Sequence, residues 1–261
     1  MSEDPIKLDR IGPILRLTLN RPQRLNACDR AMLSSLSDNL AEIAAMADAR
    51  VLVLTGEGRA FCAGQDLADK SATEDGEAIR DMLERHYNPV VRQIRTLPLP
   101  VICAVNGVAA GAGIGLALAC DFVLAKESAV FDLAFARLGL IPDAGLTFLL
   151  PRHLGWGKAL GLALLGERLT APEAARTGLI WQSIADDAFS GEVETLSRRL
   201  AELPTRTLGL MKQAFQASQH HSLEQQLALE AELQSLAAET EDFREGLNAF
   251  LEKRKAQFSG R

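Results

Sequence analysis

The stretch that decides the fold runs from Val105 to Gly115 and reads VNGVAAGAGIG. It follows an apolar, strand-like run at residues 101–105 and leads into a helix-like run of small apolar residues at 116–120. Glycine and alanine let a backbone approach a ligand without a Cβ clash. The first turn of a helix leaves backbone N–H groups free and carries a partial positive charge. The stretch therefore predicts a strand, a tight turn and a helix that can hold a negatively charged oxygen.

Such a turn could bind a dinucleotide, a phosphate or a reacting oxyanion. The dinucleotide fingerprint requires G-x-G-x-x-G, and Leu116 stands where its third glycine would be. A phosphate-binding P-loop would end in Gly-Lys-Ser or Gly-Lys-Thr, which does not follow here. The turn alone also leaves open a purely structural use, in which its glycines only allow close helix packing.

A second segment of small residues favours ligand binding over the purely structural use. Residues 56–67 read GEGRAFCAGQDL and follow another apolar, strand-like run at 51–54. Ligands in α/β folds gather at the carboxyl ends of strands. Two N–H donors from two separate loops are what an oxyanion hole requires. The two segments together therefore favour a site that stabilises negative charge on a reacting oxygen.

Composition limits the classes of function. The chain has 261 residues, 48% of them hydrophobic, which is enough to bury one substantial core. Its net charge of −6 argues against nucleic acid as a partner, and no apolar run has the length of a membrane span. Four cysteines without C-x-x-C spacing predict reduced thiols in the cytoplasm. The four histidines lack metal-ligand spacing and no G-x-S-x-G elbow occurs, so we expect no metal and a carboxylate as the catalytic group.

Periodicity describes the organisation of the chain only coarsely. Leu15, Leu17 and Leu19 alternate with polar residues, as in a half-buried strand, and strand-like runs then alternate with helical stretches. From about residue 192 the pattern is helical, with Leu229 and Leu233 on one face. We predict an α/β core over residues 1–191 and a helical C-terminal region over residues 192–261.

Six segments in order give the chain a resemblance to the enoyl-CoA hydratase/isomerase (crotonase) superfamily. They are LTLNRP at 17–22, AGQDL at 63–67, NG at 106–107, LGLIP at 138–142, GLI at 178–180 and AFLEKR at 249–254. The resemblance implies a crotonase-like spiral of ββα units followed by a helical C-terminal trimerisation region. It also implies an acyl-CoA substrate, with CoA as part of the thioester and no separate cofactor, and a homotrimer or dimer of trimers.

The chain departs from the hydratases of this family at two positions. Hydratases use two glutamates to position and activate water, and this sequence has Gly115 and Phe135 in their places. A carboxylate stands instead at Asp143, where several isomerases of the family carry an acid/base aspartate. Asp143 could also be a helix N-cap, but the loss of both glutamates favours catalysis. An apolar setting would raise its pKa and make it a better proton carrier.

Within the family, the motifs around Phe61–Leu67, Tyr87–Pro89 and Leu138–Asp143 resemble isomerases of phenylacetate catabolism that convert a ring epoxide of phenylacetyl-CoA into an oxepin. Their relatives move acyl-CoA double bonds from the 3- to the 2-position. Leu146 departs from the usual glycine and could narrow the pocket.

By resemblance, the N–H groups of Ala63 and Ala112 hold the thioester oxygen and Asp143 moves the proton. The residues expected to bind CoA are Arg24, Leu25, Ala63, Gln65, Asp66, Leu67, Phe250 and Lys253, the last two across a subunit interface. The residues expected to line the acyl pocket are Tyr87, Asn88, Gly115, Phe135 and Leu146. Simpler uses stay open: a surface charge for Arg24 and Lys253, a helix cap for Asp66, and helix packing for Tyr87 and Asn88.

Three hypotheses therefore remain: an acyl-CoA isomerase that uses Asp143, a hydratase-type lyase, and a non-catalytic CoA-binding protein. Gly115 and Phe135 speak against the second. The two donor loops together with Asp143 speak against the third.

Overall fold

The computed structural model describes residues 4–69 and 74–261 and contains two β-sheets. In the larger sheet the strands lie in the order β1-β2-β3-β5-β7-β10. Their bounds are β1 (Ile6–Ile11), β2 (Ile14–Leu19), β3 (Val51–Gly56), β5 (Val101–Val105), β7 (Phe122–Lys126) and β10 (Gln182–Ile184). Only the β1–β2 pair is antiparallel; the other neighbours run parallel. The carboxyl ends of β3, β5 and β7 therefore meet at one edge.

The smaller sheet continues from that edge. It consists of β4 (Ala60–Cys62), β6 (Val108–Ala110), β8 (Val130–Asp132) and β9 (Arg168–Thr170), in that order. The strands β4, β6 and β8 are parallel and each follows a strand of the larger sheet within a few residues. Helices then lead back to the next strand pair. This succession confirms the predicted ββα units.

Eleven labelled α-helices surround the sheets in the described ranges. Their bounds are α1 (Arg30–Ala45), α3 (Gly76–Met82), α4 (Asn88–Thr96), α5 (Ala112–Ala119), α6 (Leu146–Leu154), α7 (Trp156–Leu165), α8 (Ala171–Arg176), α9 (Phe189–Ala201), α10 (Thr205–Ala217), α11 (Leu223–Ala238) and α12 (Glu241–Glu252). Three shorter turns complete them: the 3-10 helices η1 (Pro22–Arg24) and η3 (Ala134–Leu138), and the π-helix η2 (Leu83–Tyr87). Asp29 caps α1, because its side chain accepts a hydrogen bond from the Met32 N–H at 2.9 Å.

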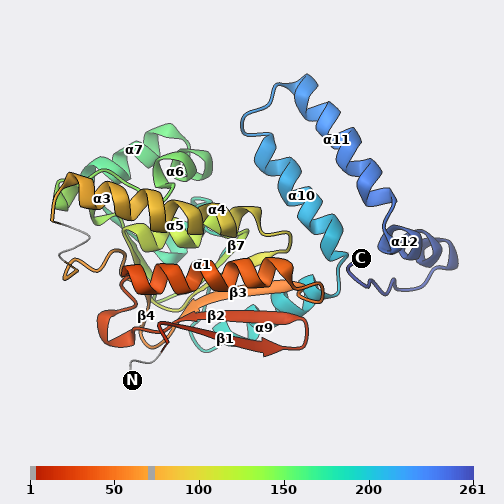
Figure 1. Cartoon of the computed structure of the whole chain (residues 1–261), viewed down its shortest axis with the longest axis horizontal. Helices are drawn as coiled ribbons and strands as arrows, with labels where there is room; N and C mark the ends of the chain where they lie inside the picture. Colours follow the sequence, from red (N-terminus) through yellow and green to blue (C-terminus); the bar gives the residue numbers. More distant parts are fainter. Residues whose placement is uncertain (1–3, 70–73) are drawn as a thin grey trace.

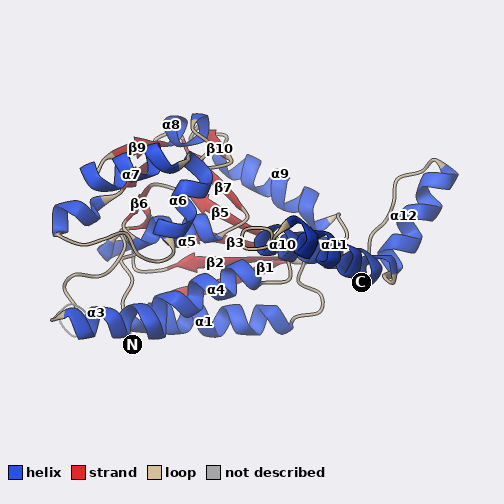
Figure 2. Ribbon diagram, turned by 90° about the horizontal axis from the view of Figure 1, so that it is seen from above, coloured by secondary structure: helices blue, strands red, loops and turns tan. Residues whose placement is uncertain are grey.

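Both faces of the central strands β3 and β5 are buried, which explains their continuous apolar sequences. In β3, Leu52 and Leu54 point into the main core with α1, α4 and α5. Val51 and Val53 point the other way and pack with Phe189 and neighbouring residues of α9. Figure 2 shows α1 and α4 on one side of the sheet and α9 on the other. The predicted boundary at 191/192 thus lies inside α9, a helix that covers the sheet.

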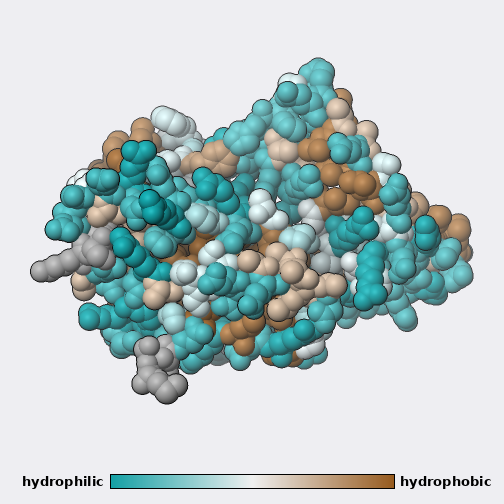
Figure 3. Space-filling model, in the orientation of Figure 1, coloured by the Kyte–Doolittle hydropathy of each residue, from teal (hydrophilic) through white to brown (hydrophobic). Residues whose placement is uncertain are grey.

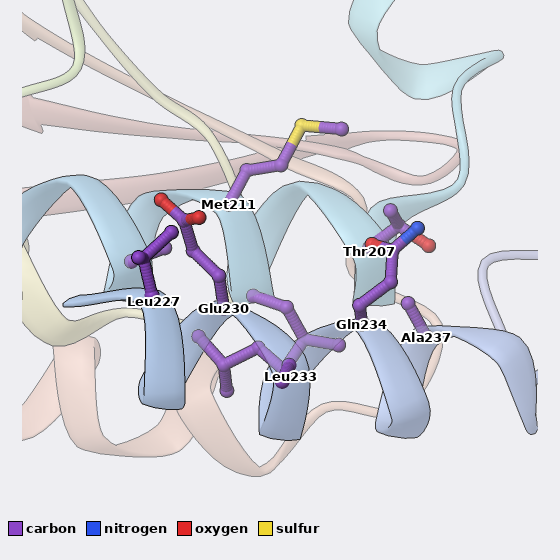
Figure 4. Close-up of a pocket in the computed structure, with 10 residues that line it drawn as sticks. Thr207, Met211, Leu227, Glu230, Leu233, Gln234 and Ala237 are labelled. Atoms are coloured by element: carbon purple, nitrogen blue, oxygen red, sulfur yellow. The ribbon is translucent and has the colours of Figure 1, made fainter. Parts of the chain in front are cut away.

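After α9 the chain leaves this body, and α10, α11 and α12 project from it (Figure 1). Leu233 is buried against α10, and Leu229 and Leu236 on the same face are half-buried. Met211 and Leu227 line a groove between α10 and α11 (Figure 4). Many apolar side chains on these helices remain exposed, and Figure 3 shows them gathered at this end of the molecule. Across the described ranges, no helix combines the length and apolar character that a membrane crossing demands.

Candidate active site

The two small-residue loops meet where the strands of the two sheets end. Gly64 follows β4 with a φ of +90°, a backbone conformation that favours glycine. A Cβ at Gly64 would lie 2.8 Å from the Ala110 carbonyl oxygen and 3.4 Å from the Ala112 nitrogen. A side chain at this position would therefore force the loops apart. The glycine brings the predicted donors Ala63 and Ala112 to the same place.

The two N–H groups are not equivalent. Ala112 is the first residue of α5, so its N–H has no partner within the helix, and among the described residues no hydrogen bond from it is found. The Ala63 N–H donates instead to the Leu25 carbonyl oxygen at 3.0 Å. Every residue of α5 is buried, so the positive end of this helix acts in a water-poor setting. The site thus offers one N–H group that is free to donate, that of Ala112, and one that already donates to the Leu25 carbonyl oxygen, that of Ala63.

Asp143 lies in the loop between η3 and α6. One of its carboxyl oxygens, Oδ1, is fully buried and has no hydrogen-bond partner among the described residues. Burial raises the pKa of Asp143 to about 6, and a hydrogen bond from its own backbone offsets this only in part. The alternative use as a helix cap is not supported, because α6 begins after Gly145 and no side chain caps it. Asp143 is therefore a carboxyl poised to exchange a proton near neutral pH.

Of the two positions where hydratases carry glutamates, Gly115 has no space for a side chain, and position 135 is occupied by a phenylalanine ring. A Cβ at Gly115 would lie 2.5 Å from the Ala144 carbonyl oxygen and 2.6 Å from the Ala144 Cβ. Ala144 itself has a φ of +48°, so the loop beside Asp143 presses its backbone against α5. Phe135 is buried in η3, and its ring tip is 3.8 Å from where a Cβ on Gly111 would be. An apolar wall replaces the pair of carboxylates.

Tyr87 and Asn88 lie at the junction of η2 and α4. Tyr87 is only 1% exposed, and in the described ranges its hydroxyl makes no well-formed hydrogen bond, only a weak interaction with the Cys28 thiol. Burial raises the pKa of Tyr87 well above its ordinary value, and the Asp143 carboxylate contributes to that shift. One turn further along α4, Val91 lies 3.6 Å from where a Cβ on Gly145 would stand. This face of α4 therefore packs against the Asp143 loop, while Asn88 is half-buried.

Leu146 is fully buried and opens α6. Its side chain is part of the main core, together with Phe135 and Tyr87. The residue that departs from the family pattern thus fills space that a glycine would leave empty.

On the other side of the oxyanion loops, Asp66 is held by Arg21. An Arg21 guanidinium nitrogen is 2.9 Å from an Asp66 carboxylate oxygen and 3.1 Å from one of Asp29. Burial alone would raise the pKa of Asp66, but hydrogen bonds from Arg21 and the Ala68 N–H outweigh it and lower the pKa. Sequence reasoning missed this use of Arg21, although the residue belongs to the LTLNRP segment at 17–22.

The remaining residues predicted to bind CoA surround this ion pair with different exposures. Arg24 is exposed, Leu25 is half-buried with a φ of +53°, and Leu67 is 56% exposed. The Gln65 side-chain oxygen is buried without a hydrogen-bond partner among the described residues. Cys28 and Cys62 form a further contact that the sequence did not reveal, with their sulfurs 3.6 Å apart beneath these loops.

Phe250 and Lys253 do not join this cluster within one chain. They belong to the end of α12, which Figure 1 places at the opposite end of the molecule from β4 and Figure 2 places opposite β6, the strand paired with β4. Phe250 is 80% exposed, and Lys253 is exposed with a φ of +55°. A contact between these residues and the loops at Ala63 would require a second copy of the chain.

Comparison with known proteins adds independent findings. Residues 10–261 match the family model for enoyl-CoA hydratase/isomerase. The chain is 49% identical over 250 residues to the 1,2-epoxyphenylacetyl-CoA isomerase of Escherichia coli, which covers 95% of each protein. It is 46% identical over 261 residues to a probable enoyl-CoA hydratase of Rhodobacter capsulatus, which covers 100% of both. Among solved structures, the enoyl-CoA hydratase of Bacillus anthracis is similar with a TM-score of 0.93 at 34% identity, covering 98% of this chain and 100% of that one.

Proposed function

The chain belongs to the enoyl-CoA hydratase/isomerase family, and from this premise we propose that it isomerises an acyl-CoA thioester, with Asp143 as the group that moves the proton. The observation that carries the proposal is the Asp143 carboxyl. It has a buried oxygen without a partner and a pKa raised by burial to about 6. An acid/base group works best when its pKa lies near the working pH.

The reaction starts at the carbon next to the thioester. The Asp143 carboxylate takes a proton from Cα, and the electron pair of that C–H bond moves toward the thioester oxygen as an enolate. The N–H groups of Ala112 and Ala63 stabilise that oxygen, and each such donor typically contributes about 2.7–4 kcal/mol. The protonated Asp143 then returns the proton to a carbon further along the acyl group. In a 3-enoyl-CoA this moves the double bond. In the ring epoxide the same proton transfer accompanies cleavage of the C–C bond shared by the epoxide and the carbon ring, which gives the oxepin. In both cases no atom is gained or lost.

Hydration is the second candidate, because relatives at 46% and 38% identity are named as hydratases. It requires groups that position and activate a water molecule. Gly115 and Phe135 offer no carboxylate, and Ala144 fills the space that a side chain at Gly115 would need. These observations favour isomerisation.

We propose as substrate the ring epoxide of phenylacetyl-CoA, a 3-enoyl-CoA, or both. The similarity to the isomerase of Escherichia coli supports the first, and the same proton transfer applied to a simple acyl chain supports the second. In this proposal Phe135 and Leu146 form part of an apolar acyl site, which is supported by the burial of both side chains. Leu146 favours a flat or narrow acyl group, because it occupies space beside the Asp143 loop.

Assembly into a trimer or a dimer of trimers is part of the proposal. The exposed apolar side chains of the C-terminal helices support it, among them Phe215, Leu223, Leu227, Phe243, Leu247 and Phe250. Such a patch is typical of an interface. In the assembly, Phe250 and Lys253 would reach the CoA bound at a neighbouring subunit, with Lys253 facing a phosphate as a point charge.

The test is the mass of the product. We expect the enzyme to convert 1,2-epoxyphenylacetyl-CoA or 3-hexenoyl-CoA into products of unchanged mass, as measured by mass spectrometry. Crotonyl-CoA should gain no water at a comparable rate. Rapid hydration of crotonyl-CoA without isomerisation of either substrate would assign the chain to the hydratases. Binding of all three thioesters without turnover would assign it to CoA-binding proteins.

A further inference from the structure

Three buried polar atoms around the candidate site make no well-formed hydrogen bond with any of the described residues. They are the Gln65 side-chain oxygen, the Tyr87 hydroxyl and Asp143 Oδ1. Buried polar atoms in proteins almost always have a partner, because an unpaired one reduces stability. The proton transfer already explains Asp143. Of the three atoms, only the Tyr87 hydroxyl is a hydrogen-bond donor, and the proposed reaction does not use it.

Tyr87 owes its position to the π-helix η2, of which it is the last residue. Short π-helical turns are frequent at functional sites, because the extra residue turns side chains away from the regular helical register. The next turn of α4 packs Val91 against the loop at Gly145. Tyr87 and Asp143 are therefore held on facing elements.

The surroundings of the hydroxyl decide what it can do. The titratable groups that act on it are the thiols of Cys28 and Cys62 and the carboxyl of Asp143, and the Cys28 sulfur is only a weak hydrogen-bond partner for the hydroxyl. Burial and these three neighbours raise the pKa of Tyr87 well above its ordinary value, so the hydroxyl keeps its proton. It can therefore only be a neutral donor or acceptor, and not a base, at any working pH.

The Tyr87 hydroxyl and the Asp143 carboxyl influence each other electrostatically, yet neither is hydrogen-bonded to the other. An alkyl chain in contact with both groups would give the hydroxyl no acceptor, whereas an oxygen atom on the acyl group would accept a hydrogen bond from it. A site built to bond a substrate oxygen discriminates strongly against analogues that lack it.

We propose that the Tyr87 hydroxyl donates a hydrogen bond to an oxygen carried by the acyl group, and that the enzyme thereby selects oxygen-bearing acyl-CoA thioesters, such as ring epoxides, over plain 3-enoyl chains. The inference rests on the proposed isomerase function and specifies the acyl group for the same site.

The experiment compares Tyr87→Phe with the parent on two substrates. Phenylalanine removes only the hydroxyl, so the packing of the ring is kept. Ser183→Ala is the matched control, because it also removes a buried hydroxyl without a described partner but lies in β10 of the larger sheet. We expect Tyr87→Phe to lower kcat/KM for 1,2-epoxyphenylacetyl-CoA by roughly 10–100-fold, the usual effect of losing one buried hydrogen bond. The value for 3-hexenoyl-CoA should stay within about threefold, and Ser183→Ala should change neither.

A second measurement is needed if the parent enzyme turns over only the epoxide and not 3-hexenoyl-CoA. Phenylacetyl-CoA has the ring but no ring oxygen, so its Kd should be the same for Tyr87→Phe and the parent. Equal losses on both substrates, or an unchanged rate on the epoxide, would overturn the inference while leaving the isomerase function standing. A parent that isomerises 3-hexenoyl-CoA but not the epoxide would overturn it as well. A parent that isomerises neither would refute the proposed function, and this inference with it.

Discussion

The lack of space around Gly115 is the main reason why we expect this chain not to hydrate an enoyl-CoA, and replacing Gly115 tests it. A Cβ at this position would lie 2.5 Å from the Ala144 carbonyl oxygen, a backbone atom that cannot rotate away. Alanine in place of glycine inside a helix normally stabilises by up to about 1 kcal/mol. Here the steric overlap reverses the sign, because forcing extra atoms into a packed core costs about 1–3 kcal/mol. We therefore expect Gly115→Ala to lower the Tm by a few °C, at roughly 2–4 °C per kcal/mol for a chain of this size.

Restoring both hydratase glutamates raises that cost. Phe135→Glu removes a buried ring, and large-to-small changes of aromatic core residues cost about 3–5 kcal/mol. Two neighbouring buried carboxylates would also repel each other and need partners that the apolar wall lacks. The total approaches the whole stability of a typical domain, about 5–15 kcal/mol.

Thermal unfolding and crotonyl-CoA hydration of Gly115→Ala and of the double glutamate variant are the assays. Gly157→Ala is the matched control for the first, because a Cβ there meets no atom within 4 Å and alanine should raise the Tm slightly or leave it unchanged. A Gly115→Ala protein as stable as the parent would refute the steric argument. Efficient hydration by a folded double variant would show that the scaffold is prepared for water.

Three further predictions follow from the same geometry. Because burial raises the pKa of Asp143 to about 6, kcat/KM should fall as the pH drops through about 6; a rate that is flat from pH 5 to 8 would contradict this. Because burial favours the protonated form of Asp143, the folded state loses stability relative to the unfolded state as the pH rises through about 6. Asp143→Asn removes this loss, so it should raise the Tm more at pH 8 than at pH 4. Truncation after Glu239 should weaken both assembly in light scattering and CoA binding, and an unchanged Kd would place Phe250 and Lys253 outside the site.

Local sequence patterns predicted the secondary-structure elements that surround the site. The run of small residues from Val105 to Gly115 indicated a strand, a turn and a helix start, and the structure has β5, β6 and the start of α5 there. The two donor loops were predicted from small residues that follow two strand-like runs, whereas the choice of Ala63 and Ala112 came from the resemblance to the family. The absence of carboxylates at Gly115 and Phe135 is a property of the sequence itself.

Contacts between distant segments could not be read in this way. The bond from the Ala63 N–H to Leu25 depends on a left-handed backbone at Leu25, which no pattern of apolar residues encodes. Ala144 closes the space above Gly115 only because the loop holding Asp143 folds back onto α5. The weak pairing of the Tyr87 hydroxyl is likewise visible only when its neighbours are known. Such features arise from tertiary packing, which acts between residues far apart in sequence.

The most direct test of Asp143 is a comparison of turnover and binding in Asp143→Asn. Asparagine keeps the shape of the side chain but cannot carry the proton, so kcat for isomerisation should fall by about 10²–10⁴-fold. The Kd for an unreactive CoA thioester should stay within about threefold, since Asp143 is assigned to proton transfer and is not among the residues expected to bind CoA. Asp186→Asn, an exposed carboxylate bonded to Ser128, is the control and should leave both values unchanged. An Asp143→Asn enzyme with turnover within threefold of the parent would contradict the assignment of Asp143 as the proton carrier.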